Sequence, residues 1–372
     1  MSSSRLVLVL NAGSSSLKWV VLEAATEAIV HQGQATWDVT EPGRHATEVA
    51  RALDSLPPLD AVGHRVVHGG ARFQRPVLVD QSVRDQIADL TELAPLHNPA
   101  AVAGIDAVRA QFPDLPQVAT FDTAFHASMP DAAAIYPLPR AWTTRWGLRR
   151  FGFHGLSVAY AVGRAHELVG RLPRRLVVCH LGAGCSISAV ADGRSVSTSM
   201  GFTPLEGVMM ARRSGSVDPG LLLYLLSRQG LDVAELDQAL NEHSGLLGVS
   251  GVSADLREVL DAAAAGHEPA QLARDTFVHS LVAHAGAMIA VLGGIDALVF
   301  TGGIGEHSSV IRAGVSAAFG YVGLRLDRRL NEAAATDDRD IAAGDSAVRV
   351  LVIGAREDLT IVRQVRQVLG WT

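Results

Sequence analysis

The 372-residue sequence has little of several features that would point to particular classes of protein. It contains two cysteines, Cys179 and Cys185, both in apolar or glycine-rich surroundings, so we expect no disulfide framework and a reducing compartment. No apolar run reaches membrane-spanning length without charges or glycines, and no basic segment with a cleavage site opens the chain. The net charge of -6 gives no electrostatic footprint for nucleic acid or an anionic membrane. We therefore expect a cytoplasmic protein without a nucleic-acid or membrane partner.

Several catalytic motifs are also missing. The sequence has fourteen histidines, but HExxH and HxxEH spacings do not occur, which speaks against a zinc centre. No GxSxG elbow is present, which speaks against an α/β-hydrolase. The Walker A pattern GxxxxGK[ST] does not occur either, so a kinase with this sequence would not be of the P-loop type.

Length and composition indicate a globular enzyme with more than one core. A chain of this length exceeds one ordinary domain, and 48% of its residues are hydrophobic against 19% charged. Segments typical of buried strands alternate with segments of helical spacing in both halves of the chain. This alternation predicts the α/β class.

The stretch Leu6–Leu22 predicts a β-hairpin with a polar tip. Leu6–Leu10 is an apolar run enriched in valine, and Leu17–Leu22 is a second run interrupted only by Lys18. The residues between them, Asn11–Ser16, are small and turn-forming. Three hydroxyls, an amide, open backbone N–H groups and the nearby lysine suit phosphate oxygens. A solvated polar turn is the alternative for the same residues.

Two later stretches repeat the pattern of a buried strand that ends in small residues. Leu176–Leu181 is followed by Gly182–Ser186 and by a second, alternating strand, roughly 170 residues after the first hairpin. Ala297–Phe300 enters the glycine loop Thr301–Glu306, with a helix expected directly after it; a flexible connecting loop is the alternative to an anion site there. The repeat indicates a duplicated domain. Since ligands bind at strand ends in open α/β sheets, we expect a nucleotide in a cleft between two similar domains.

Other elements are expected from periodicity and from proline and glycine punctuation. Strands are expected at Ile29–Thr36, Asp60–Gly70 and Gln117–Phe121, and helices at Ala46–Leu56, Ser82–Leu93, Ala100–Gln111, from Ser157, Pro269–Leu292 and Asp358–Leu369.

Two arginines stand where a cation needs a partner. Arg65 lies in the apolar segment Gly63–His68, and Arg213 lies where an apolar run turns into a glycine loop. Guanidinium groups bind planar and tetrahedral oxyanions through paired N–H donors, so these two suit a carboxylate and a transferring phosphoryl group. Structural ion pairs are the alternative for both.

Two carboxylates suit a magnesium site. Asp122 follows the expected strand Gln117–Phe121, and Glu357 precedes the last expected helix. One or two carboxylates together with substrate phosphates are the usual ligands of Mg²⁺ in proteins. A carboxylate that stabilises the start of a helix is the alternative for each.

Nine motifs, in order and nearly from end to end, resemble the acetate kinase family of short-chain carboxylate kinases, within the actin/sugar-kinase/Hsp70 fold superfamily. They are NAGSSSLK at Asn11–Lys18, GHRVVHGG at Gly63–Gly70, LAPLHNP at Leu93–Pro99, FDTAFH at Phe121–His126, RRFGFHG at Arg149–Gly155, SMGFTPLEGVMM at Ser199–Met210, RSGSVDP at Arg213–Pro219, SGLLGVSG at Ser244–Gly251 and GGIGE at Gly302–Glu306.

The resemblance implies two duplicated actin-like (ribonuclease H-like) domains with a nucleotide cleft between them. The first would span 1–127 and 358–372, and the second 128–357. The implied reaction is reversible, direct in-line transfer of the γ-phosphoryl group of ATP to acetate, giving acetyl phosphate and ADP, with Mg²⁺ or Mn²⁺, in a homodimer. The alternatives are a kinase that prefers propionate or butyrate and an actin-like nucleotide-binding module without catalysis.

The resemblance also assigns roles to single residues. Catalytic roles fall to Arg65, Asp122, His154 and Arg213. His97 and His180 would support His154. Metal binding falls to Asn11 and Glu357, beside Asp122. Substrate binding falls to Arg65, Val67, Leu96, Phe153 and Pro204. Nucleotide binding falls to Asn11, Ser14, Ser16, Lys18, His180, Gly182, Gly184, Asp255, Leu256, Arg257, Gly303, Ile304, Gly305 and His307.

The sequence departs from the family pattern on the nucleotide side. Ala183 and His307 stand where the family carries amides. An amide donates to phosphate oxygens and alanine does not, so these departures bear on which phosphoryl donor is preferred and how tightly it binds.

Overall fold

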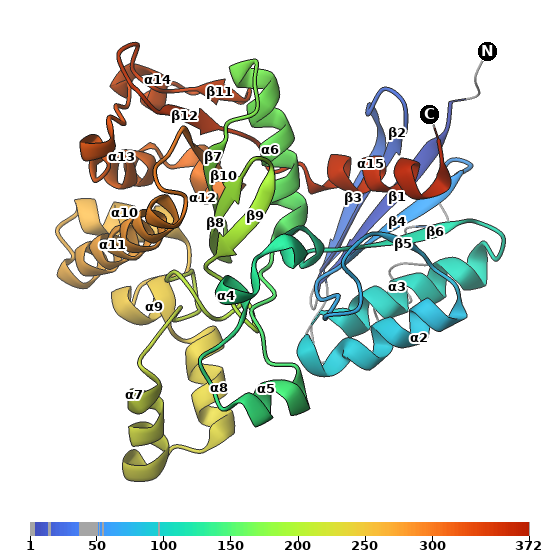
Figure 1. The fold of residues 1–372 in the computed structure, drawn as a ribbon, viewed down its shortest axis with the longest axis horizontal. Coiled ribbons are helices and arrows are strands. Elements are labelled where there is room, and N and C mark those ends of the chain that lie inside the picture. The colour runs from blue at the N-terminus through green and yellow to red at the C-terminus, as the bar shows by residue number, and fades with distance from the viewer. Residues whose placement is uncertain are drawn as a thin grey trace. The chain divides into compact units, whose positions relative to one another are not determined.

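The structure is a computed structural model that describes residues 4–13, 16–36, 51, 53, 56–95 and 97–371. The chain divides into two compact units (Figure 1). Unit 1 comprises Met1–Ala127, Phe153–Tyr160 and Arg356–Thr372, and unit 2 comprises Ser128–Gly152 and Ala161–Ala355. Most of the expected helix Ala46–Leu56 lies outside the described residues.

Unit 1 contains a six-stranded sheet with the order β3-β2-β1-β4-β6-β5. Its strands are β1 (Leu6–Ala12), β2 (Ser16–Glu23), β3 (Ile29–Thr36), β4 (Ala61–Val66), β5 (Val77–Leu78) and β6 (Gln117–Phe121). The expected hairpin is confirmed, because β1 and β2 pair antiparallel with Asn11 opposite Lys18. The strands β1, β4 and β6 are parallel neighbours, so their carboxyl ends meet at one edge of the sheet.

Helices cover both faces of this sheet (Figure 1). They include α2 (Gln81–Asp89), α3 (Asn98–Gln111) and the C-terminal α15 (Glu357–Leu369). Helix α3 packs against β1 and β4, whereas α15 packs against β1, β4 and β6. Gly63 on β4 permits the close approach of α15, because a Cβ at this position would collide with Ile361.

Unit 2 repeats the topology of unit 1. Its sheet has the order β11-β12-β10-β7-β8-β9. The strands are β7 (Arg175–Leu181), β8 (Cys185–Ala191), β9 (Arg194–Thr198), β10 (Ala297–Thr301), β11 (Arg339–Asp340) and β12 (Arg349–Val352). Taken in chain order, the strands of the two units occupy the same sheet positions, and each sheet begins with an antiparallel hairpin. The prediction of a duplicated α/β fold is therefore confirmed.

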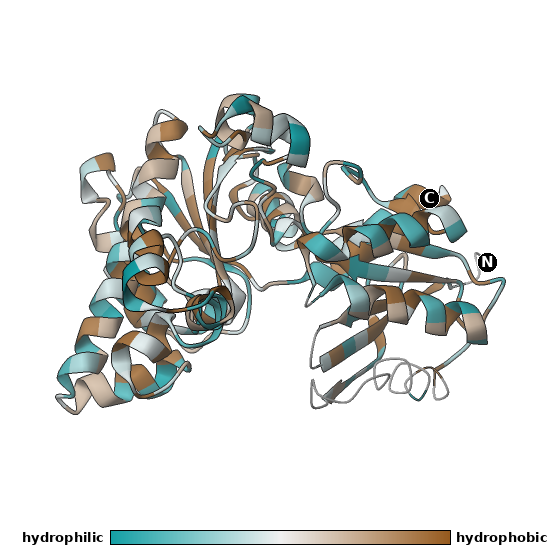
Figure 2. Ribbon diagram, turned by 90° about the horizontal axis from the view of Figure 1, so that it is seen from below, coloured by the Kyte–Doolittle hydropathy of each residue, from teal (hydrophilic) through white to brown (hydrophobic). Residues whose placement is uncertain are grey.

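Unit 2 carries most of the helices. They are α4 (Asp131–Ala134), α5 (Arg140–Trp146), α6 (Gly155–Val169, which begins in unit 1), α7 (Pro219–Tyr224), α8 (Val233–Glu242), α9 (Gly245–Ser250), α10 (Leu256–Ala264), α11 (Glu268–Val291), α12 (Gly302–His307), α13 (Ser309–Ala317) and α14 (Arg328–Glu332). Helix α11 packs against β7 and β8. Figure 2 shows hydrophobic and hydrophilic residues mixed on the helices, as expected where one helix face covers a sheet and the other meets water.

Three expectations about local structure need correction. The stretch Thr301–Glu306 is not an open glycine loop, because Gly302–His307 forms the short helix α12. Gly302 has a φ of +77°, which turns the chain from β10 straight into this helix, and a Cβ there would lie 2.8 Å from the backbone of Leu181. Strand β4 ends at Val66, so Val67 lies beyond it. The expected helix Ser82–Leu93 is α-helical only to Asp89 and then tightens into a 3₁₀ turn.

Cys179 and Cys185 are both buried and free. Among the residues that the structure describes, no helix has the combination of length and apolar character that crossing a bilayer requires.

Candidate active site

In unit 1, the carboxyl ends of three parallel strands bring polar side chains around Arg65. Arg65 lies on β4, Asn11 lies near the end of β1, and Asp122 directly follows β6. Arg65 donates to the two oxygens of Asp122, from Nε at 3.0 Å and from Nη2 at 2.5 Å. Its Nη1 donates to Asn11 Oδ1 at 3.0 Å, and its Nε lies 3.4 Å from Oε2 of Glu357, the first residue of α15. The structure thus brings together four of the predicted site residues.

Burial strengthens the electrostatic interactions between Arg65 and the two carboxylates. Asp122 is 1% exposed, while the side chains of Arg65 and Glu357 are each 19% exposed. Burial alone acts to lower the pKa of Arg65, but the charges of Asp122 and Glu357 outweigh it, so the net pKa is raised. Arg65 therefore stays cationic, and it retains this charge at the edge of the sheet where ligands of α/β folds bind.

The oxygen atoms of Asn11, Asp122 and Glu357 fit the chemistry of Mg²⁺. This ion prefers oxygen ligands and binds proteins through one or two carboxylates, with water and substrate phosphates completing its coordination. All three side chains here lie around one guanidinium group and offer only oxygens toward it. Within the described parts of the chain, no three histidine, cysteine, aspartate or glutamate side chains form a cluster that would hold a metal without such help.

His154 lies in an unusual backbone conformation beside Asp122. Its φ is +58°, which is uncommon for a residue other than glycine. The next residue, Gly155, donates its N–H to the carbonyl of Asp122 at 2.8 Å, and a Cβ on Gly155 would collide with that oxygen. This hydrogen bond holds the turn that contains His154 against Asp122, the residue that pairs with Arg65.

Two of the residues predicted to bind the acetate methyl group are buried in unit 1. Val67 is 8% exposed and Phe153 is 2% exposed. The Phe153 ring meets the His68 ring edge to face at 5.4 Å between centroids, and the Phe153 carbonyl accepts from His126 Nε2 at 2.9 Å. Pro204 lies in unit 2. Leu96 and Ser14 lie outside the described residues, so their predicted roles stay predictions.

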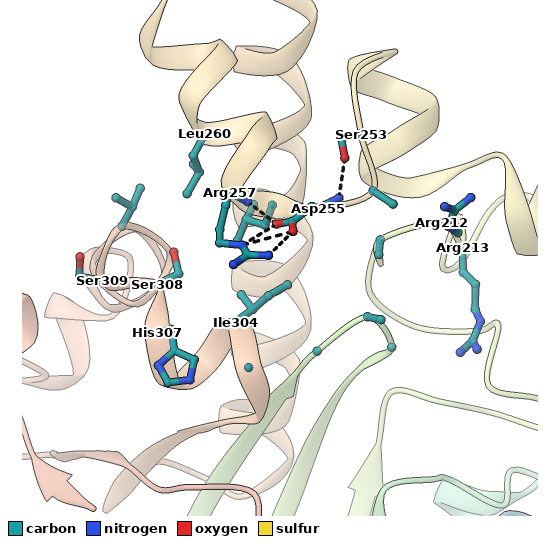
Figure 3. Close-up of a pocket in the computed structure, with 18 of the residues that line it drawn as sticks. Arg212, Arg213, Ser253, Asp255, Arg257, Leu260, Ile304, His307, Ser308 and Ser309 are labelled. Carbon is teal, nitrogen blue, oxygen red and sulfur yellow. Dashed lines mark hydrogen bonds and ion pairs between the residues drawn. The ribbon is translucent and has the colours of Figure 1, made fainter. Parts of the chain in front are cut away.

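Unit 2 contains a cavity of about 960 Å³ at the carboxyl ends of its parallel strands (Figure 3). Eight of the residues predicted to bind the nucleotide line it, from the β7–β8 turn, the start of α10 and helix α12. These are Gly182, Gly184, Asp255, Leu256, Arg257, Gly303, Ile304 and His307. The volume is in the range of pockets that hold a nucleotide-sized ligand.

Asp255 and Arg257 form one wall of this cavity, and Figure 3 shows their ion pair above Ile304 and His307. Asp255 caps the N-terminus of α10 by accepting from the Arg257 N–H at 2.8 Å, and the Arg257 Nη2 lies 2.6 Å from Asp255 Oδ2. The side-chain hydrogen bond from Arg257 lowers the pKa of Asp255 to about 2. Asp255 is therefore ionised at neutral pH, and it holds Arg257 by a charge-assisted pair at the mouth of the cavity.

Arg213, also on the cavity wall, is a partly buried cation. Its Nη1 donates to the carbonyl of Pro204 at 3.2 Å and lies 3.9 Å from the sulfur of Met210. No carboxylate forms an ion pair with it among the described residues. Burial lowers the pKa of Arg213, and burial also raises the pKa of the nearby Cys185 thiol to about 12, so this thiol supplies no anion at neutral pH. The site thus holds a desolvated positive charge that a bound anion would stabilise.

Some predicted nucleotide-binding residues lie elsewhere. His180 on β7 and the buried Gly305 on α12 are not among the residues that line the cavity. Ser16 and Lys18 lie on β2 of unit 1, where Lys18 is exposed. The sequence analysis did not predict several other residues that line the cavity, because they belong to none of the motifs at strand ends. The one sequence signal near any of them is the helix-cap pattern before α10. These lining residues are Asn241, Ser253, Ala254, Leu260, Ser308, Ser309 and Val310.

A duplicated sheet with an open cavity at its strand ends places the chain in the class of two-domain actin-like α/β proteins. Comparison with known proteins gives the family within this class. The model of the acetokinase family matches residues 44–363, and the chain therefore belongs to this family. An acetate kinase of Nostoc punctiforme is 46% identical over 403 aligned residues, covering 98% of this chain and 99% of the relative. An acetate kinase of Deinococcus radiodurans is 45% identical, covering 98% of both chains.

Solved structures agree with the sequence comparison. The acetate kinase of Porphyromonas gingivalis superposes with a TM-score of 0.91 at 36% identity, over 98% of this chain and all of the other. A propionate kinase of Francisella tularensis superposes with a TM-score of 0.88 at 35% identity, over 97% of this chain and 98% of the other. The resemblance on which the residue assignments rest is confirmed.

Proposed function

We propose that this chain transfers the γ-phosphoryl group of ATP to acetate, reversibly, giving acetyl phosphate and ADP. The observation that carries the proposal is the partly buried guanidinium of Arg213, which has no carboxylate partner among the described residues and lies on the wall of the cavity in unit 2. If Arg213 served only to stabilise the fold, the chain would be expected to pair it with a carboxylate of its own. In phosphoryl transfer, the anion that pairs with Arg213 arrives with the substrates.

The reaction as proposed needs no protein nucleophile. One acetate oxygen attacks the γ-phosphorus while the bond from this phosphorus to the β,γ-bridging oxygen breaks, and ADP leaves with that electron pair. Acetate is already ionised, so no general base is required, and catalysis consists of alignment and charge stabilisation. Arg65 and Arg213 supply positive charge, and His154 supplies a hydrogen-bond donor.

The residues of unit 1 also set where a metal would be held. Asn11, Asp122 and Glu357 would hold Mg²⁺ together with substrate phosphates, and when bound this ion neutralises charge on the phosphate oxygens. Asp122 has a second task, because its carboxylate accepts from Nε and Nη2 of Arg65 and so fixes one edge of the guanidinium group. We further propose the cytoplasm as the compartment and a homodimer as the assembly, as the family resemblance implies.

A second candidate acceptor is propionate, because a propionate kinase superposes on this chain almost as well as an acetate kinase does. One methylene in an apolar pocket changes discrimination by only about 1–3 kcal/mol, so Val67 and its neighbours decide the preference.

The function is tested by trapping the acyl phosphate as its hydroxamate. Acetate, propionate and butyrate are each supplied with ATP, GTP or pyrophosphate in the presence of Mg²⁺. We expect the highest kcat/KM for acetate with ATP. A higher kcat/KM for propionate with the same donor would replace acetate as the acceptor, and absence of hydroxamate with every pair would refute the carboxylate kinase assignment.

A further inference from the structure

A cluster of three side chains in unit 2 braces the loop that contacts Arg213, without itself being part of the proposed catalytic set. Tyr136 follows α4, Arg150 precedes the end of the segment Ser128–Gly152, and Glu206 lies in the loop Ser199–Gly207. Arg150 Nη2 donates to Glu206 Oε1 at 2.6 Å, and the Tyr136 hydroxyl donates to Glu206 Oε2. The Arg150 guanidinium also lies over the Tyr136 ring, 5.4 Å from its centroid. Each member of the cluster therefore contacts both of the others.

This cluster ties the two ends of the loop together. Arg150 Nη1 donates to the carbonyls of Ser199 at 3.1 Å and Met200 at 3.2 Å, at the start of the loop. The same guanidinium holds Glu206 near the end of the loop, so one side chain spans it. In the middle, the N–H of Phe202 donates to the Tyr136 hydroxyl oxygen at 2.8 Å.

The loop is shaped to accept the cluster. A Cβ at Gly201 would collide with Glu206 Oε2 and with the Tyr136 hydroxyl, so only glycine leaves room for the carboxylate. Gly207 closes the loop with a φ of +113°. Its carbonyl accepts from the Ser216 N–H at 2.8 Å, and its N–H donates to the Ser216 hydroxyl oxygen at 3.0 Å. Burial and the neighbouring Glu206 raise the pKa of Tyr136, so the phenol keeps its donor proton across the neutral range.

The middle of the loop contacts Arg213, the arginine with a proposed catalytic role. Its residue Pro204 offers the carbonyl that accepts from Arg213 Nη1 at 3.2 Å. Within the described part of the chain, this guanidinium also contacts the weakly accepting sulfur of Met210. A shift of the loop would therefore move the main hydrogen-bond acceptor that orients Arg213, together with the predicted apolar contact of Pro204.

We propose that Arg150, Glu206 and Tyr136 are positioning residues for the reaction. They hold the loop Ser199–Gly207 so that Pro204 orients the Arg213 guanidinium and limits the length of the carboxylate that the enzyme accepts. This inference rests on the proposed carboxylate kinase function and extends it to residues that touch neither substrate. Loosening the cluster is expected to lower kcat and to relax the choice between acetate and propionate, while the affinity for ATP stays the same.

The test compares three mild variants with a matched control. Glu206→Gln keeps size and removes charge, Tyr136→Phe removes one oxygen, and Arg150→Lys keeps charge but lacks the fork that spans the loop. The control is Asp296→Asn, which breaks the ion pair between Asp296 and Arg175. This pair lies at the amino ends of β7 and β10, whereas the cavity lies at their carboxyl ends. The exposure of the two side chains is similar, 29% for Asp296 and 33% for Glu206. The measurements are kcat and KM for acetate, propionate and ATP, and the thermal midpoint of unfolding.

We expect each cluster variant to lower kcat/KM for acetate by roughly tenfold and to raise the propionate-to-acetate ratio of kcat/KM by roughly threefold or more. The KM for ATP should stay within roughly twofold of wild type in all variants. Asp296→Asn should lower the thermal midpoint without changing either kinetic ratio. Tyr136→Phe is the decisive variant if the other two fail to fold, because it removes a single hydroxyl.

Two different failures are distinguishable. If the wild-type chain is an active carboxylate kinase but Tyr136→Phe behaves like Asp296→Asn, with altered stability and unchanged selectivity, the positioning role is wrong. If the wild-type chain phosphorylates no carboxylate, the proposed function is wrong and the inference falls with it.

Discussion

The backbone N–H of Gly155 donates to the backbone carbonyl of Asp122 at 2.8 Å, while the Asp122 carboxylate forms a two-point ion pair with Arg65. Asp122 thus holds the turn of His154 through its main chain and the guanidinium of Arg65 through its side chain. The two tasks are separable, because a substitution of the side chain leaves the backbone contact in place.

Asp122→Asn is therefore expected to fold and to lose activity. Asparagine keeps the shape but removes the charge that pairs with Arg65 and that a hard cation requires, so the Mg²⁺ concentration for half-maximal rate should rise and kcat should fall by roughly tenfold or more. A Mg²⁺ titration of the variant measures both. A titration curve that superposes on that of wild type would rule out a metal role for Asp122.

Val67→Ala should move substrate preference toward propionate. The side chain is 8% exposed just beyond β4, two residues after Arg65, and its truncation enlarges the predicted methyl pocket. The matched control is Val66→Ala, whose fully buried side chain belongs to the apolar core of unit 1 and whose truncation should reduce stability without changing selectivity. If the propionate-to-acetate ratio of kcat/KM changes equally in both variants, Val67 does not line the pocket.

The cavity in unit 2, where we propose that the nucleotide binds, should bind ATP more tightly when family-type amides are restored. Ala183 and His307 both line the cavity, and a neutral hydrogen bond contributes about 0.5–1.5 kcal/mol. Introducing Ala183→Asn and His307→Asn together should lower the KM for ATP by roughly threefold to tenfold, with little change in the KM for acetate. His279→Asn, an exposed histidine outside the cavity, should change neither value. An unchanged ATP KM in the double variant would mean that these positions do not touch the nucleotide.

Unit 1 is expected to lose stability as the pH falls from 6.5 toward 4. His64 and His126 are fully buried, and burial lowers the pKa of each from 6.5 to about 4. The unfolded chain binds protons on both groups in this range whereas the folded chain does not, so the free energy of unfolding decreases with falling pH. The denaturation midpoint should drop across this range in wild type and drop less in His64→Gln, which has no titratable ring. Equal slopes for the two proteins would exclude a contribution from His64.

Local sequence patterns predicted the main strands of the two sheets. The two hairpins and the strand Gln117–Phe121 follow from apolar, β-branched runs bounded by small residues, and the structure has them where expected. The helix at Gly302–His307 was missed because its glycine-rich sequence has low helix propensity; the positive φ of Gly302 and packing against Leu181 override that preference.

Contacts between distant residues could not be predicted from local patterns. Arg65 was expected to need a partner, but only the parallel order of β1, β4 and β6 brings Asn11 and Asp122 to it. The links from Arg150 and Tyr136 to Glu206 also join distant segments, 56 and 70 residues apart in the chain, and no spacing rule connects them. Pairings of this kind are set by topology and become visible once the chain is folded.

The most direct test of the account is the kcat of Arg213→Ala in the acetate and ATP reaction, measured beside the exposed-site control Arg228→Ala. A partly buried guanidinium that stabilises charge mainly in the transition state should contribute to kcat more than to substrate affinity. We predict that Arg213→Ala, folded with a thermal midpoint close to that of wild type, lowers kcat by roughly 100-fold or more, and that Arg228→Ala does not lower it. A folded Arg213→Ala protein with the kcat of wild type would contradict the account.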